Sequence, residues 1–188
     1  MRLNVKVIAP VIMAAIMLIG VVSMSSPPSP LGSEEWPLPP ADMPLENITS
    51  NMNISNFVFF GGQPVASLGT GLDFPLGSTA FYYVGAYKNS TFVAFVVAKL
   101  PDPQYSVQFG GRALNSLKEN LPEEDVRYLV TNEGGFLQYQ GTNQTLVLWY
   151  GHSWYFEIMA GKGGNVGKEA VQAVKRAIYE AIQRVQRA

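Results

Sequence analysis

The clearest apolar pattern in the chain lies close to its C-terminus. Between residues 165 and 188 the apolar side chains recur three or four positions apart and form one stripe: Val171, Val174, Ile178, Ala181, Ile182 and Val185. A stripe at this spacing is typical of a helix that packs one face against a core. Asn165 is a candidate N-cap, and Arg184 and Arg187 suit the negative end of the helix dipole. We therefore expect a long closing helix that covers the domain.

Two runs of β-branched and aromatic residues in STAFYYVGAYKNSTFVAFVVAKLPDP, residues 78–103, predict an antiparallel hairpin. They meet at Asn89-Ser90, and two prolines end the second run. If Lys88 pairs with Thr91, one face carries Phe81, Tyr83, Tyr87, Phe92, Ala94 and Val96, and the other carries Tyr82, Val84, Ala86, Val93, Phe95 and Val97. Both faces are apolar. We therefore expect the hairpin to lie inside the sheet with cover on each side, or to present its second face to a partner.

Shorter elements fill the rest of the domain. A short strand is expected around residues 57–60, before a loop rich in glycine and proline. Residues 110–122, GGRALNSLKENLP, carry three leucines at helical spacing and end near a proline, which predicts a short helix. Residues 126–161 contain several strand-like runs separated by glycine-rich turns. The fold class is therefore α+β: one domain of antiparallel sheet covered by a short helix and a long C-terminal helix.

The single histidine lies in LVLWYGHSWYFEIMAG, residues 146–161. A two-residue loop of Gly151-His152 would pair Trp149 with Trp154, and glycine at the first loop position suits a type II′ turn. His152 would then point to solvent from the tip of the turn. A general base usually needs an orienting partner and a zinc site needs three or four ligands, so we expect no catalytic or metal-binding role for His152.

The aromatic residues around this turn divide between the two faces of the predicted hairpin. Trp149 and Trp154 share one face, where we expect them to pack under the closing helix. Tyr150 and Tyr155 fall on the opposite face. Because tyrosine combines a large apolar ring with a polar tip, we expect these two to be exposed contacts for a partner or a ligand.

The N-terminus carries a membrane signal over residues 1–26. Arg2 and Lys6 precede an uncharged run that is apolar from Val7 to Val22. A spanning helix needs about 20 apolar residues and the core of a signal peptide about 7 to 15, so the run fits either a retained anchor or a cleaved leader. The basic residues before this run predict that the following chain lies outside the cytoplasm. We expect a single-pass membrane protein with an extracytoplasmic C-terminal domain, or a secreted protein after cleavage.

A proline-rich segment follows the membrane signal. Residues 24–46 contain seven prolines and no Lys or Arg, which favours an extended polyproline conformation. We therefore interpret residues 27–54 as a stalk and residues 55–188 as the globular domain. Trp36, Leu38 and Leu45 could anchor part of this stalk to a surface.

Composition removes several classes of chemistry. The chain has no cysteine, which excludes disulfides, thiolate metal sites and cysteine nucleophiles. A net charge of -1, with 14% charged residues, gives nucleic acid no basic surface to bind. Residues 161–170, GKGGNVGKEA, fail the phosphate-loop pattern because Lys162 stands where glycine is needed and Glu169 where serine or threonine is needed.

The carboxylates show no motif that would link them. Three adjacent acidic residues at 123–125 are the ordinary opening of a turn and do not supply the oxygen ligands of calcium. The remaining candidates are scattered along the sequence: Asp73, Asp102, Glu133 and Glu157. We therefore expect no catalytic, cofactor-binding or metal-binding residue, and no cofactor. A hydrolase stays as an alternative.

The order of hairpin, helix, meander and closing helix resembles the PsbP-like group of exported α+β domains, over residues 55–187. The resemblance rests on element order and on the strand, turn, WYFEI strand and helix at the end of the chain. It implies an antiparallel sheet covered by helices and a non-catalytic accessory or binding role. It carries over no site residue.

These observations predict a membrane-anchored extracytoplasmic binding domain, an accessory subunit of a cell-envelope complex with a protein partner there. The alternative is a cell-surface receptor for a small molecule or a glycan. The candidate contacts are Tyr150, Tyr155, Tyr82, Val84 and Phe95. Four N-x-S/T triplets offer candidate glycosylation sites at Asn47, Asn53, Asn89 and Asn143.

Overall fold

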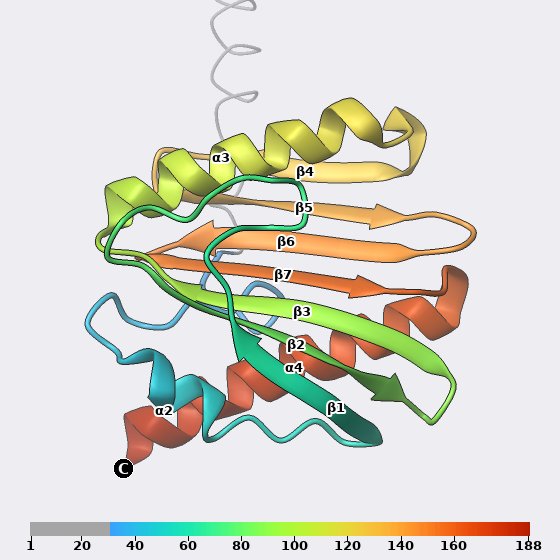
Figure 1. Cartoon of the computed structure of the whole chain (residues 1–188), viewed down its shortest axis with the longest axis horizontal. Coiled ribbons are helices and arrows are strands. Elements are labelled where there is room, and N and C mark those ends of the chain that lie inside the picture. The colour runs from blue at the N-terminus through green and yellow to red at the C-terminus, as the bar shows by residue number, and fades with distance from the viewer. Residues whose placement is uncertain (1–30) are drawn as a thin grey trace, which may run out of the picture.

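A computed structural model describes residues 31–188, which form a seven-stranded antiparallel sheet (Figure 1). The strand order is β1-β2-β3-β7-β6-β5-β4. The strands are β1 (Phe57–Pro64), β2 (Thr79–Tyr87), β3 (Thr91–Lys99), β4 (Val126–Val130), β5 (Gly134–Gln140), β6 (Thr145–Gly151) and β7 (Trp154–Ala160). The pairing of β3 with β7 joins the predicted hairpin to the predicted meander. The α+β class is confirmed.

Helices cover both faces of the sheet (Figure 1). Helix α3 (Pro103–Asn120) lies on one face, across β5, β6 and β7. The long helix α4 (Gly164–Arg187) lies on the other, together with the short helix α2 (Leu45–Thr49). A 3-10 turn, Glu123–Asp125, precedes β4. Because helices cover both faces, the inner strand β6 is buried along its whole length, and its residues 146–150 form an unbroken apolar run.

The core on the α4 side is built around the two tryptophans of the β6–β7 hairpin. Trp149 and Trp154 are fully buried against the apolar stripe of α4, which includes Val174 and Ile178. The ring of Trp149 stacks on Phe156 with the centroids 4.7 Å apart. The closing helix and the core position of both tryptophans are therefore confirmed. The helix begins at Gly164 with Gly163 as its N-cap, so the prediction of Asn165 as N-cap is wrong.

The core on the α3 side depends on close approach between a helix and an aromatic ring. Phe109 and Leu114 of α3 pack against Tyr150 and Tyr155 of the sheet. A Cβ atom at Gly110 would lie only 2.1 Å from the Tyr150 ring. Glycine at this helix position therefore lets α3 lie directly on the tyrosine.

Helix α3 begins seven residues earlier than its leucine spacing predicts. Its N-cap is Asp102, whose carboxylate accepts a hydrogen bond of 2.9 Å from the backbone N–H of Tyr105. Proline fits the first turn of a helix because that turn needs no intrahelical N–H donor. Pro103 therefore not only follows the preceding strand but also starts the helix.

The segment that we interpreted as a stalk packs on the domain from residue 31 onward. Trp36 is fully buried, stacks on Phe136 at 4.2 Å, and belongs to the core on the α4 side. The indole N–H groups of Trp149 and Trp154 donate to the carbonyls of Pro37 and Pro40, at 2.7 and 3.0 Å. The prediction of an extended stalk over residues 27–54 is therefore wrong for its described part, because apolar anchors outweigh the proline content there.

The β2–β3 hairpin pairs one residue away from the predicted register. Tyr87, not Lys88, pairs with Thr91. Lys88 and Asn89 adopt positive φ angles of 49° and 56°, so the loop contains three residues, and the N–H of Ser90 bonds to the carbonyl of Tyr87 at 3.2 Å. A slip of one residue exchanges the faces of one strand relative to the other. Tyr83 therefore shares a face with Phe95, and Tyr82 shares one with Val96.

The turn between β6 and β7 consists of His152 and Ser153, with φ angles of 52° and 72°. Positive φ at both positions is the type I′ geometry, one residue later than the predicted Gly151-His152 turn. His152 is exposed at the tip, as expected.

The predicted membrane segment, residues 1–26, and the first residues of the predicted stalk lie outside the described residues. Within residues 31–188 no helix has the length and apolar character needed to cross a membrane.

Candidate functional site

The α3-side face of the sheet is only partly covered. Helix α3 lies over β5, β6 and β7, and the β1–β2 loop, residues 65–78, crosses the same face in front of β3 and β7, whereas the ends of β2 and β3 near their hairpin turn, with β1 beside them, extend beyond both (Figure 1). We call the uncovered surface the open face. Its side chains are Val58 of β1, Tyr82, Val84 and Ala86 of β2, Phe92 of β3 and Met159 of β7.

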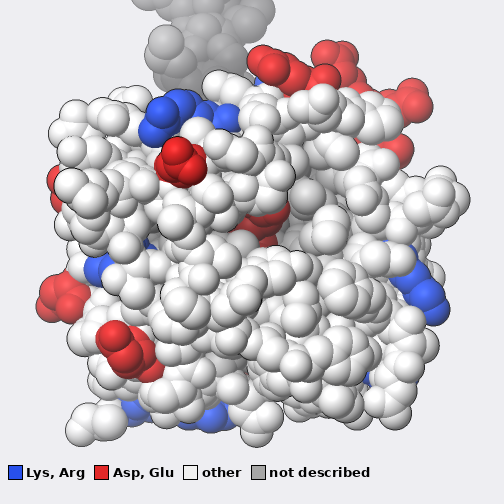
Figure 2. Space-filling model, viewed as in Figure 1, with Lys and Arg blue, Asp and Glu red and all other residues white. Residues whose placement is uncertain are grey.

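The open face is apolar and carries no charge of its own. Val58 is 49% and Phe92 46% exposed, and the other members are half-buried. Figure 2 shows a broad uncharged area over this part of the sheet, with charged side chains mainly at its margins. An apolar patch of this kind on a folded domain usually marks a surface for interaction.

The strand register explains how these side chains come together. Val84 of β2 and Met159 of β7 both lie opposite Ala94 of β3, and they form one row across the sheet. Ala86 lies between Val58 and Phe92 in a second row. Alternate residues of a strand point to the same face, so β2 contributes three side chains to this surface, and β1, β3 and β7 contribute one each.

One carboxylate lies at the inner border of the open face. Glu157 is the only acidic residue in the seven strands. It lies opposite Leu148 on one side and Val96 on the other. Figure 2 shows a hollow near the centre of the view, beside the open face, with an acidic side chain at its floor.

The electrostatic setting of Glu157 is unusual for a carboxylate. Its Oε2 accepts a hydrogen bond of 2.5 Å from the hydroxyl of Tyr155, which is fully buried. Within residues 31–188, no Lys or Arg lies within ion-pair distance of Glu157. Burial raises the pKa of Glu157, and the hydrogen bond from Tyr155 opposes that rise. The carboxylate is therefore desolvated without a compensating cation.

Tyr155 and Tyr150 also titrate outside their ordinary range. Burial, followed by the nearby charge of Glu157, raises the pKa of Tyr155 well above its usual value. Burial raises the pKa of Tyr150 to about 12. The hydroxyl of Tyr150 is buried and has no hydrogen-bond partner in the described chain. Both tyrosines therefore stay neutral near pH 7.

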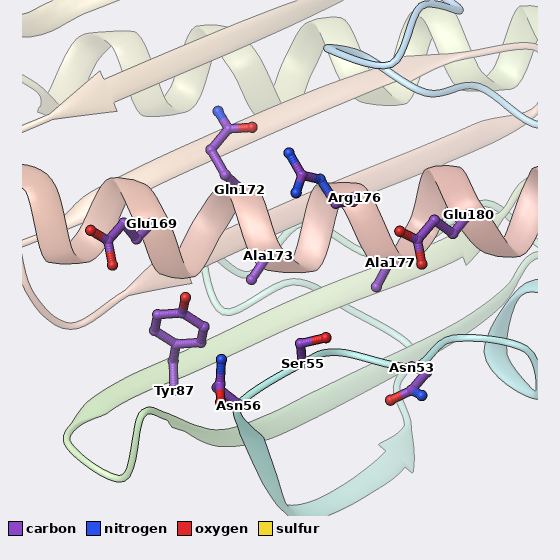
Figure 3. Close-up of a pocket in the computed structure, with 10 residues that line it drawn as sticks. All are labelled: Asn53, Ser55, Asn56, Tyr87, Glu169, Gln172, Ala173, Arg176, Ala177 and Glu180. Atoms are coloured by element: carbon purple, nitrogen blue, oxygen red, sulfur yellow. The ribbon is translucent and has the colours of Figure 1, made fainter.

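A second concave region lies on the opposite side of the molecule. It is a groove of about 350 Å³ between α4 and residues 53–56, above Tyr87 (Figure 3). Glu169, Arg176 and Glu180 project from α4 beside it. Its polar lining is otherwise made of Asn53, Ser55, Asn56 and Gln172.

The charges around this groove neutralise one another in solvent. Glu169 pairs with Lys88 at 2.7 Å, and that pairing raises the pKa of Lys88. Arg176 lies 3.9 Å from Glu34, and Glu180 lies 3.5 Å from Arg184. All of these side chains are about half exposed or more. Exposed pairs of this kind contribute little and are easily rearranged, so the groove offers no preorganised ligand site.

The structure places two of the five predicted contact residues on the open face and the other three in the core. Tyr82 and Val84 lie on the open face and are half-buried. Tyr150, Tyr155 and Phe95 are at most 1% exposed, so the prediction that they form surface contacts is wrong. The two tyrosines lie beneath α3, and Phe95 faces the α4 side.

Sequence reasoning did not identify Glu157 as a site residue, because no motif distinguishes it from the other carboxylates scattered along the chain. Asp102, another member of that group, is the N-cap of α3. The available signal was the position of Glu157 inside the apolar strand WYFEIMA, where alternation places it on the same face as Tyr155.

Three of the four candidate glycosylation sites are exposed: Asn53, Asn89 and Asn143. Asn47 is half-buried within α2. Glycosylation itself stays a prediction.

The sequence matches no protein-family model and no curated protein. Among solved structures, the chain is similar to a GTP-binding regulator from Thermotoga maritima, with 16% identity and a TM-score of 0.54 over 76% of this chain and 92% of the other. It is also similar to the extracellular domain of PknH from Mycobacterium tuberculosis, with 10% identity and a TM-score of 0.43 over 77% and 93%. The first likeness shows the fold alone. The PsbP-like resemblance stays a prediction.

Proposed function

We propose that this chain is a non-catalytic binding domain that works outside the cytoplasm, as an accessory subunit of a cell-envelope complex. The basic residues and apolar run of residues 1–26 support this location and a membrane anchor. The observation that carries the binding function is the open face, an uncharged apolar surface beside a carboxylate that lacks a basic partner.

The occupant of the open face is a protein. The surface extends across β1, β2 and β3 as a broad sheet face, which suits a protein interface better than the enclosed pocket typical of a small ligand. Charge complementarity points to a partner that is apolar where it meets Phe92 and basic where it meets Glu157. The glycan alternative loses its support because Tyr150 and Tyr155, its proposed stacking residues, are buried.

Because the N-terminal segment packs on the domain from residue 31 onward, it shortens the distance between the domain and a membrane anchor. If the run that ends at Val22 spans the bilayer, only eight residues separate it from residue 31, where the described domain begins. Eight residues reach at most about 30 Å even when fully extended. The domain is therefore held close to the membrane, where its partner would be another membrane-associated protein.

Site-specific photocrosslinking in native membranes tests this proposal. With p-benzoylphenylalanine at position 92 of the full chain, we expect one discrete adduct, and we expect Val58→Asp in the same chain to weaken it. The matched control is the photoprobe at Tyr128, which is 49% exposed on the opposite edge strand. Equal adducts at both positions, or none at position 92, would contradict the proposal.

A further inference from the structure

The carboxylate of Glu157 has an environment that structural needs alone do not explain. Its strand neighbours are apolar, and its only polar contact within the described chain is the hydroxyl of Tyr155. A desolvated carboxylate without a cation is costly, and replacing it with an apolar residue would usually stabilise a sheet. Side chains with perturbed pKa values in a hollow are candidates for a functional site.

The walls around Glu157 fit an apolar stem. Val96 and Leu148 flank it on the adjacent strands, and Met159 follows two residues later on the same face. Tyr82 lies one strand further away, opposite Val96. The hollow that Figure 2 shows over this part of the sheet opens beside the open face. A ligand group that enters it would meet apolar walls first and the carboxylate last.

The groups that face Glu157 cannot neutralise it. From the strands these groups are tyrosines: Tyr82 on β2, Tyr139 on β5, Tyr150 on β6 and Tyr155 on β7. The β1–β2 loop, residues 65–78, packs on the same face through Phe74, whose ring lies edge-on to Tyr155 with the centroids 6.1 Å apart, and the one charged residue of this loop, Asp73, is acidic and exposed. From α3 the basic side chains are Arg112, which is exposed, and Lys118, whose ammonium lies 3.7 Å from the ring centroid of Tyr128. Neither forms an ion pair with Glu157. A cation that pairs with Glu157 would therefore have to come from another molecule.

We infer that Glu157 and its apolar walls form a pocket for one organic cation, a primary ammonium or guanidinium group on an apolar stem, as in a lysine or arginine side chain. This inference rests on the proposed function, because it assigns the pocket to a basic side chain of the protein that covers the open face. Such a buried basic anchor is the kind of residue that dominates an interface.

A metal ion does not fit this position. No group of three or more His, Asp or Glu side chains in residues 31–188 converges to hold one. Calcium takes six to eight oxygen ligands, and Glu157 offers one free carboxylate oxygen beside apolar walls. A single organic cation needs only one charge-assisted hydrogen bond and contact along its stem.

Binding of a matched pair of small probes tests the pocket. 2-Phenylethylamine and 2-phenylethanol share the same stem and differ in the ammonium group. In NMR titrations of the full chain in detergent micelles, we expect the amine to shift the amide signals of residues 157–159 and to bind about tenfold or more tightly than the alcohol, as suits a hydrogen bond to a charged group. We expect Glu157→Gln to remove that preference.

Control variants make the outcome specific. Glu169→Gln removes a carboxylate on α4 and should leave the preference for the amine unchanged. Glu157→Gln keeps the size of the side chain, and unchanged amide signals far from residue 157 in this variant show that the fold is retained, which separates loss of charge from loss of fold. If wild type binds amine and alcohol equally, or if Glu157→Gln keeps the preference, the cation pocket is wrong. The photocrosslink at position 92 can still form in that case, so this failure is distinct from failure of the proposed function.

Discussion

The hydroxyl of Tyr155 donates a hydrogen bond to the carboxylate of Glu157, two residues further along β7, with 2.5 Å between the oxygens. Residues i and i+2 of a strand lie on the same face, so both side chains project toward α3. Phe109 of α3 and Phe74 of the β1–β2 loop cover the tyrosine, which is fully buried, whereas Glu157 is half-buried. The pair therefore marks the boundary between the closed core and the open face.

The raised pKa of Glu157 predicts a pH-dependent cost to stability. Below its unfolded-state pKa the side chain is neutral in both states and contributes nothing. As the pH rises through the raised folded-state pKa, the unfolded chain has already lost its proton, so stability falls. We expect Glu157→Gln to be more stable than wild type at pH 7 and equally stable near pH 4. Urea unfolding across this range measures the difference, and a difference independent of pH would contradict it.

The lowered pKa of Lys175 predicts that stability rises with pH in the alkaline range, opposite to the effect of Glu157. Its side chain is buried, and its ammonium lies 3.7 Å from the ring centroid of Trp36. Burial lowers the pKa of Lys175 to about 8, with Glu35 opposing and Arg127 adding to the shift. The folded state therefore releases this proton before the unfolded chain does, and stability gains from about pH 8 to the unfolded-state pKa of 10.5.

The substitution Lys175→Met tests this interpretation. It removes the buried charge but also the attraction between the ammonium and the indole ring, which is worth about 1–2 kcal/mol. We expect a net gain of about 1–2 kcal/mol at pH 7, because the shift in pKa corresponds to about 3 kcal/mol. The gain should shrink toward pH 10. Denaturation curves at pH 7 and pH 10 show it, and a constant gain would argue against the buried charge as its cause.

The burial of Trp36 predicts that the N-terminal segment unfolds cooperatively with the rest of the domain. Its ring is fully buried between Phe136 and Lys175. We expect Trp36→Ala to lower the free energy of unfolding by about 3–5 kcal/mol, as for other large core truncations. Leu76 is 100% exposed, so Leu76→Ala should change stability by less than about 0.5 kcal/mol. Urea unfolding of both variants compares them, and equal stabilities would restore the stalk interpretation.

Two adjacent glycines in α3 predict opposite effects of the same substitution. A Cβ at Gly110 would lie 2.1 Å from the Tyr150 ring, whereas one at Gly111 would lie 3.8 Å from the hydroxyl of Tyr150. We expect Gly110→Ala to destabilise by about 1–3 kcal/mol through overpacking. Gly111→Ala should stabilise by up to about 1 kcal/mol, because alanine favours helix interiors. Thermal unfolding distinguishes them, and a stabilised Gly110→Ala would show that α3 lies further from the sheet.

We expect the uncharged edge strand β1 to make copies of the protein associate with one another in a concentration-dependent way. It contains no charged residue, and Phe60 is 64% exposed. Charged residues on an edge strand discourage pairing with another chain. We expect Phe60→Lys to reduce association of the full chain in detergent, measured by light scattering. Val130→Lys on the other edge, where Arg127 is already present, should have little effect. Equal effects of the two variants would exclude β1 as the strand through which the protein associates.

The two hairpins show how far local patterns determine a fold. The predicted β6–β7 pairing was two residues from the observed register, and because side chains alternate with a period of two, the faces of Trp149 and Tyr155 were still assigned correctly. The predicted β2–β3 pairing was one residue away, which placed Phe92 and Phe95 each with the wrong neighbours on β2. Turn residues with positive φ fix these registers, and the sequence does not distinguish a two-residue loop from a three-residue loop at Lys88.

The sequence by itself determined the helical stripe of α4, the strands, the turn position of His152 and the core position of both tryptophans, because periodicity and turn chemistry act over a few residues. Only the tertiary structure decided that Trp36 joins the core, that α3 seals Tyr150 and Tyr155, and that Glu157 lies beside an uncovered apolar face. These outcomes depend on contacts between segments far apart in the chain. Burial and desolvation arise from such contacts, so a local pattern of residues does not contain them.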